Sequence, residues 1–73
     1  MIMTTSVYVI KVKGRLGAEW SEWFEGLTVF PLPSGETLLR GAVVDEAALF
    51  GLLGKVCDLG LPLLSVQLLR EKA

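Results

Sequence analysis

The hydrophobic positions along the chain change their period several times, and each change marks the border of a predicted element. Between Ser6 and Lys13 the side chains alternate, which predicts a strand with Tyr8, Ile10 and Val12 on its helix-covered face. From Ala18 to Glu25 the spacing changes to three- and four-residue steps, carried by two Trp and one Phe, which predicts a short helix with its aromatic side inward.

Two further strands are predicted around a tight turn. Leu27–Leu32 and Glu36–Val44 both read as extended segments, and Pro33–Gly35 between them has typical turn composition. Pro31 lies inside the first of these strands and has no N–H to donate to a neighbour. We therefore expect the Leu27–Leu32 strand at an edge of its sheet.

The most regular apolar stripe in the sequence comes after the Glu36–Val44 strand. Asp45 is a good helix N-cap, because its carboxylate can accept hydrogen bonds from the free N–H groups of a first turn. Gly60 suits the left-handed position after a helix, and Pro62 prevents the helix from resuming. The sequence predicts an amphipathic helix between these signals, with one buried stripe: Leu49, Leu52, Leu53, Val56 and Leu59.

The last predicted element is the segment Leu63–Leu69, which returns to a period of two. It reads as a buried strand with Leu64, Val66 and Leu68 on one face. The order of elements becomes β-α-β-β-α-β, the pattern of the ferredoxin-like fold. We expect one α+β domain over residues 1–73: a four-stranded antiparallel sheet in the order 4-1-3-2, with two helices on one face.

Composition adds an expectation about assembly. The chain has 73 residues, of which 52% are hydrophobic, yet so small a domain has much surface and little interior. We therefore expect a second copy to cover part of this apolar surface, making a homo-oligomer. A sheet extended through the Leu63–Leu69 strand is one route. The predicted contact residues lie on the bare sheet face and on the outer side of the long helix: Val7, Val9, Phe30, Phe50, Gly54 and Cys57.

Charge narrows the classes of partner. With seven basic and eight acidic residues the net charge is −1, so neither a nucleic acid nor an anionic membrane is an expected partner. Met1–Ile10 has no basic leader, and Lys55 and Asp58 interrupt the most apolar region, so we expect no signal peptide and no membrane span. The lone Cys57 excludes an internal disulfide. A cytoplasmic protein is the expectation.

Catalytic chemistry has few candidates. The chain contains no His, which removes the commonest general base and metal ligand. Cys57 cannot hold a metal alone and has no His to activate it, so we interpret it as a packed or interface thiol. Helix capping explains Asp45 and Glu46. We therefore expect no catalytic residues, metal site or cofactor; an enzyme on a ferredoxin-like barrel is the third hypothesis.

One loop is a candidate binding site. Lys13, Gly14, Arg15 and Gly17 come directly before a predicted helix N-terminus, where backbone N–H groups and the helix dipole favour an anion. A plain connecting loop is the simpler interpretation. Binding of a small molecule at this loop is the alternative that we keep.

The segment Val44–Val66 resembles a family of short bacterial proteins with the pattern V-D-[QE]-A-A-L-x-G-L-L, then D-L-G-L-P-L-L-S-V. This chain has Glu46, Phe50 and Cys57 where that family usually has Gln, His and Arg. No activity comes with the resemblance. The residues that carry it here are Val44, Asp45, Ala47, Ala48, Leu49, Gly51, Leu52, Leu53, Asp58, Leu59, Gly60, Leu61, Pro62, Leu63, Leu64, Ser65 and Val66.

The same helix and strand are more distantly similar to ACT domains, which are ligand-binding modules of ferredoxin-like fold. This similarity implies a ligand at the Gly14–Gly17 loop. Two functional hypotheses follow. The first is a non-enzymatic, homo-oligomeric interaction or regulatory module, and the alternative is an ACT-like sensor of a small ligand.

Overall fold

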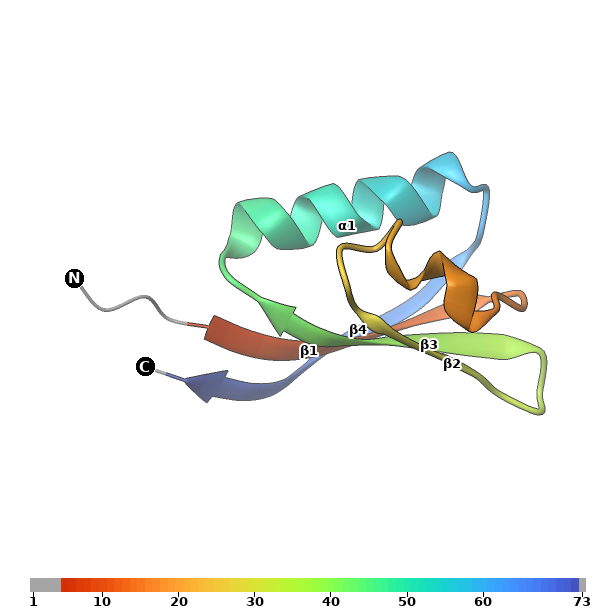
Figure 1. Ribbon diagram of the computed structural model, residues 1–73, viewed down its shortest axis with the longest axis horizontal. Coiled ribbons are helices and arrows are strands. Elements are labelled where there is room, and N and C mark those ends of the chain that lie inside the picture. Colours follow the sequence, from red (N-terminus) through yellow and green to blue (C-terminus); the bar gives the residue numbers. More distant parts are fainter. Residues whose placement is uncertain (1–4, 73) are drawn as a thin grey trace.

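The computed structural model describes the backbone of residues 5–72 and the side chains of residues 6–69. Figure 1 shows a sheet with its helices on one side and nothing on the other. In chain order the elements of these residues are strand β1 (Thr5–Lys13), the 3₁₀ helix η1 (Ala18–Ser21), strands β2 (Thr28–Pro31) and β3 (Glu36–Val43), helix α1 (Glu46–Asp58) and strand β4 (Leu63–Lys72).

The strands within residues 5–72 form one sheet in the order β2-β3-β1-β4, and every neighbouring pair is antiparallel. The predicted α+β class, antiparallel sheet and strand order are therefore confirmed. β2 lies at one edge, as Pro31 requires. β4 lies at the other edge and extends beyond the predicted Leu69 to Lys72.

The central strand β1 holds the core together. Its residues Ile10 and Val12 are fully buried on the face toward α1, as the alternation predicts. Ile10 lies opposite Leu39 in β3 and opposite Val66 in β4. Because facing residues of antiparallel strands point to the same side of a sheet, Val66 also points to the side of α1.

The predicted helix over Ala18–Glu25 is wrong in type and length. Only four residues adopt 3₁₀ geometry, and turns follow as far as Gly26. Glu25 has a positive φ of 58°, which ends any right-handed helix there, and the Gly26 N–H donates to the Ser21 carbonyl at 2.9 Å. So short a segment cannot offset the cost of helix nucleation. Within the described residues the sheet carries one α-helix instead of two.

Helix α1 follows the prediction closely. The Asp45 carboxylate accepts the Ala48 N–H at 2.8 Å, and Gly60 with φ of 75° lies just past the end of the helix. Leu49, Leu52 and Val56 are buried. Leu53 and Leu59, the other two residues of the predicted stripe, are half-buried. None of the helices in the described part of the chain is long and apolar enough to cross a membrane.

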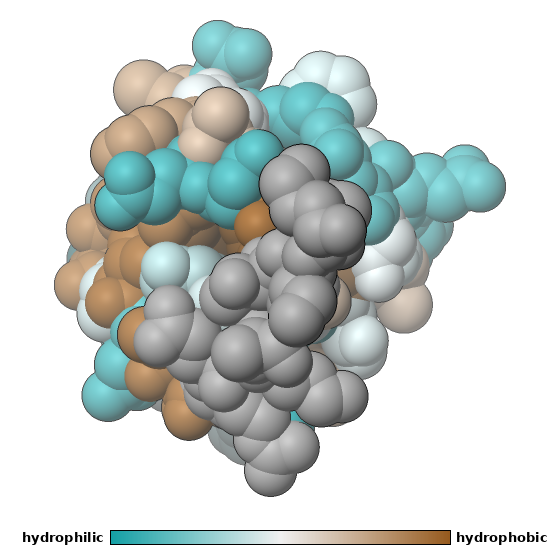
Figure 2. Space-filling view, turned by 90° about the vertical axis from the view of Figure 1, so that its left-hand side faces the viewer, coloured by the Kyte–Doolittle hydropathy of each residue, from teal (hydrophilic) through white to brown (hydrophobic). Residues whose placement is uncertain are grey.

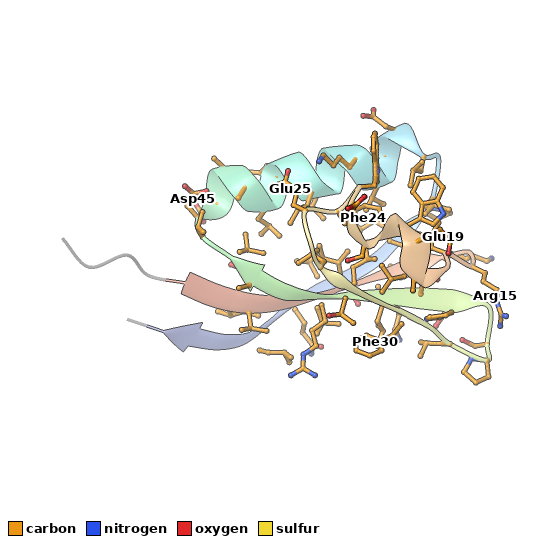
Figure 3. All side chains as sticks on the ribbon, in the orientation of Figure 1. Arg15, Glu19, Phe24, Glu25, Phe30 and Asp45 are labelled. Atoms are coloured by element: carbon orange, nitrogen blue, oxygen red, sulfur yellow. The ribbon has the colours of Figure 1, made fainter. Side chains whose placement is uncertain are left out.

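The core lies between two layers. One layer is α1 together with residues 18–26, which we call the η1 segment, and the other is the face of β1, β2 and β3 that they cover. Phe24 points from the η1 segment into this core (Figure 3) and is fully buried. Trp23 is different: it was predicted to pack inward but is 42% exposed, because the helical spacing ends before it. The buried apolar residues are Ile10, Val12, Leu16, Phe24, Leu27, Val29, Leu39, Val43, Leu49, Leu52 and Val56.

Candidate interaction surface

Strand β4 exposes a row of apolar side chains that we call the β4 surface: Leu63, Leu64, Val66, Leu68 and Leu69. Their exposed fractions run from 37% for Val66 to 50% for Leu68 and Leu69. The prediction that this segment is a buried strand is therefore wrong for the single chain. The buried side of α1 packs on residues of β1 and β3, and β4 lies beyond that layer at the edge of the sheet.

The backbone of β4 is also free on one side. One edge pairs with β1, and no other strand among the described residues pairs with the outer edge. The segment Leu63–Leu69 contains no charged residue, Pro or Gly. Charges and prolines are the usual protection of edge strands against pairing. The opposite edge strand, β2, has only four residues and ends in Pro31.

The outer side of α1 exposes apolar residues as well. Lys55 marks the side that faces the η1 segment, since its Nζ donates to the Trp23 carbonyl at 3.0 Å. Phe50 and Cys57 are seven residues apart, so they share the side turned away from Lys55. Phe50 is 65% exposed. Gly54 and Cys57 are exposed too; their role as contact residues stays a prediction.

Hydrophobic atoms gather on one flank of the molecule. In Figure 2, brown hydrophobic atoms gather on the left-hand side, which is the side at the rear of Figure 1. Charged and polar groups in teal lie above them and on the right. An apolar region of this kind is typical of a surface that contacts another protein.

The bare face of the sheet is more mixed than the sequence suggested. Val7 and Val9 are half-buried, and Phe30 is 43% exposed and points away from α1 (Figure 3). Val9 lies opposite Arg40 in β3, and the neighbouring Lys11 forms an ion pair with Glu36 at 3.8 Å. The predicted contact residues on this face are thus present but interspersed with charges.

The Gly14–Gly17 loop is fixed by one buried hydroxyl. Thr37 in β3 is fully buried, and its Oγ1 donates to the Gly14 carbonyl at 2.6 Å. The same oxygen accepts the Leu16 N–H at 3.1 Å. The Gly14 N–H donates to the Gly35 carbonyl at 3.0 Å. Two backbone N–H groups of the loop therefore bind within the chain.

The charges around this loop have both signs. Lys13 and Arg15 are exposed, and Arg15 Nη2 lies 3.4 Å from the Leu32 carbonyl. The Glu19 carboxylate lies against Gly17, because a Cβ built on Gly17 would be 2.8 Å from Glu19 Cδ. Lys13 ends β1, and the other three predicted ligand-binding residues lie in the loop that follows, with a carboxylate beside it. Ligand binding at the loop stays a prediction.

A shallow recess lies between α1 and the chain that leads from η1 into β2. Its volume of about 170 Å³ is below the range of roughly 300–1,000 Å³ usual for ligand pockets. Glu25, which lines the recess, forms an ion pair of 3.1 Å with Lys55. Within the described residues no three acidic, Cys or His side chains come together as a metal site. The recess is lined by Phe24, Glu25, Leu27, Ala42, Val43, Val44, Ala48 and Leu52.

The sequence interpretation did not include the leucines of the β4 surface among the contact residues. The signal was available: Leu63–Leu69 is an uncharged run, and the predicted strand order already placed it at an edge. Thr37 was also missed, since a single Thr in a strand pattern gives no sign that its hydroxyl holds a distant loop.

The fold and the β4 surface define a small α+β protein with an antiparallel open sheet and an apolar edge. A family model described as "Domain of unknown function (DUF8691)" matches residues 7–67. That match runs from β1 into β4 and covers most of the 73 residues, so the chain belongs to this family. No curated protein and no solved structure matches the chain.

Proposed function

We propose that this protein is a non-enzymatic interaction or regulatory module that assembles with copies of itself through the β4 surface. The observation that carries the proposal is the outer edge of β4, which combines a free backbone with an uncharged, exposed apolar row from Leu63 to Leu69. A free edge of this composition pairs readily with another strand. A second copy of the chain supplies such a strand.

The comparison between the two sheet edges supports the choice of β4. β2 offers four residues, one of them Pro31, whereas β4 offers ten residues. Pairing through β4 would satisfy its free N–H and C=O groups and remove the leucines from water at the same time. The bare sheet face is the second candidate surface, but a contact there would bury Arg40 and the Lys11–Glu36 ion pair.

The proposal also covers the fold family and the cellular compartment. We infer that the chain is a ferredoxin-like domain whose first helix is reduced to η1, because the strand order and directions match that pattern. The likeness to ACT domains and to the short bacterial proteins with the Val44–Val66 pattern rests on this fold and on the sequence. A cytoplasmic setting accords with the single Cys57.

Binding of a small anion at the Gly14–Gly17 loop is the second proposal. Its support is the pair of exposed cations, Lys13 and Arg15, on a loop that the Thr37 hydroxyl holds in one conformation. A thermal-shift series with amino acids and nucleotides tests it, because a ligand that binds the folded state raises the melting temperature. No shift with any ligand would contradict it.

The test of the main proposal compares two substitutions at similarly exposed apolar sites. Val66→Lys places two like charges in the proposed contact, whereas Phe30→Lys charges the bare sheet face. Both side chains are part-exposed in the single chain, at 37% and 43%, so both variants should fold. We expect light scattering at micromolar concentration to show an oligomer for the wild type and for Phe30→Lys, and a monomer for Val66→Lys.

Two other results would contradict the proposal. A monomeric wild type at every concentration would contradict the assembly itself. An oligomer that survives Val66→Lys and dissociates with Phe30→Lys would move the contact to the bare face of the sheet.

A further inference from the structure

The apolar segment of β4 has an internal symmetry. Read from either end, Leu63–Leu69 gives two leucines, a polar residue, Val66, a polar residue and two leucines. Leu63 thus corresponds to Leu69, Leu64 to Leu68 and Ser65 to Gln67. A segment with this pattern is complementary to a second copy of itself in the antiparallel direction, because each residue meets one of its own kind.

The strand also has one irregularity on each side of Val66. The pairing of β4 with β1 shifts register once on each side of Val66: Leu64 is passed over between Leu63 and Ser65, and Leu69 between Leu68 and Arg70. Such bulges bend a strand and increase its twist. The stretch Ser65–Leu68 between them pairs regularly with β1. The regular part of the edge thus includes Val66, the middle residue of the symmetric sequence.

Two antiparallel copies of one strand are related by a two-fold axis perpendicular to their sheet. Facing residues must point to the same side of the sheet, so the axis passes through a residue and never between two residues. We propose, resting on the assembly through β4, that two chains form an isologous dimer with the axis at Val66. Val66 then faces the partner subunit's Val66, and Leu64 faces the partner subunit's Leu68.

Neighbouring registers lose this match. With the axis at Ser65, Leu63 would face Gln67, and with the axis at Gln67, Ser65 would face Leu69. Each shift therefore sets leucines against polar side chains. Only the register centred on Val66 keeps apolar against apolar and polar against polar over all seven residues.

This geometry also gives the exposed side of α1 a role. A two-fold axis perpendicular to the sheet keeps the α1 helices of both subunits on the same face. Val66 points to that face, since it lies opposite the buried Ile10. The seam between subunits would then have an apolar floor from β4 of both chains, bordered by the α1 sides that carry Phe50. The 65% exposure of Phe50 belongs to the single chain and would fall in the dimer.

Disulfide trapping tests the register directly. The background is Cys57→Ser, which removes the exposed native thiol. Cα atoms of facing residues in antiparallel strands are about 4.5–5.5 Å apart, within the roughly 4.4–6.8 Å that a disulfide spans. Val66→Cys in this background should therefore shift under mild oxidation to a covalent dimer that reductant reverses.

Leu64→Cys alone is the matched control. Its equivalent in the other subunit lies four residues along the strand, about 13 Å away, so it should not cross-link to itself. A mixture of Leu64→Cys and Leu68→Cys proteins should give a covalent heterodimer. If Val66→Lys dissociates the dimer but Val66→Cys stays uncrosslinked, the register is wrong while assembly through β4 stands. A monomeric Cys57→Ser and wild-type protein would overturn both.

Discussion

At the scale of single residues, Thr37 shows how one side chain joins distant parts of the chain. It is the buried polar side chain of the described core, with no exposed surface. Its hydroxyl bonds at once to Gly14 and to the N–H of Leu16, more than twenty residues earlier in sequence. The hydroxyl therefore fixes the exit of β1 and the position of Leu16, which is itself part of the core.

Thr37→Val is expected to destabilise the protein although it keeps the volume of the side chain. The variant leaves a buried N–H and a C=O without partners, and each such group costs about 1–3 kcal/mol. We predict a loss of about 2 kcal/mol or more in the free energy of unfolding, measured with urea. Thr37→Ser keeps the hydroxyl and serves as the control. A Val variant as stable as the wild type would show that water replaces the hydroxyl.

At the scale of elements, α1 and η1 show what a sequence pattern can and cannot predict. α1 was predictable because three signals agree on one helix. These are the apolar spacing from Leu49 to Val56, the N-cap residue Asp45 and the C-terminal Gly60. In η1 the aromatic spacing alone suggested a helix, but the left-handed Glu25 ends it, and no local pattern announces that conformation. In β4 the alternation gave the correct face, yet alternation does not say whether a second layer covers that face.

The glycines of α1 give a prediction at this scale. Gly51 and Gly54 lie inside the helix, and no described atom comes within 4 Å of a Cβ built on either. Ala in place of Gly in an exposed helix interior gains about 1 kcal/mol. We therefore expect Gly54→Ala and Gly51→Ala each to raise the free energy of unfolding by about this amount, as seen in urea titrations.

The same pair of variants also tests the sequence-based expectation that Gly54 is a contact residue. In an assembly through β4 both variants should keep the oligomeric state of the wild type. Should Gly54→Ala dissociate the oligomer while Gly51→Ala leaves it intact, a close approach of backbones at α1 would replace the β4 contact.

At the scale of the whole molecule, the layers are uneven. α1 and the η1 segment cover β1, β2 and β3 on one face, while β4 has neither a cover nor an outer neighbour among residues 5–72. The high hydrophobic content that suggested an oligomer from sequence is concentrated at this edge, where five of the exposed large apolar residues lie. The excess of hydrophobic residues therefore lies in a strand that is able to pair with the same strand of a second copy.

Amide hydrogen exchange followed over a dilution series tests this account most directly, because it reads the backbone of each edge separately. At concentrations where chains associate, we predict slow exchange for the outward amides between Ser65 and Leu68, which becomes fast on dilution. The β2 amides should exchange at one rate throughout. Protection that appears at β2 with concentration, or exchange at β4 that ignores concentration, would contradict the account.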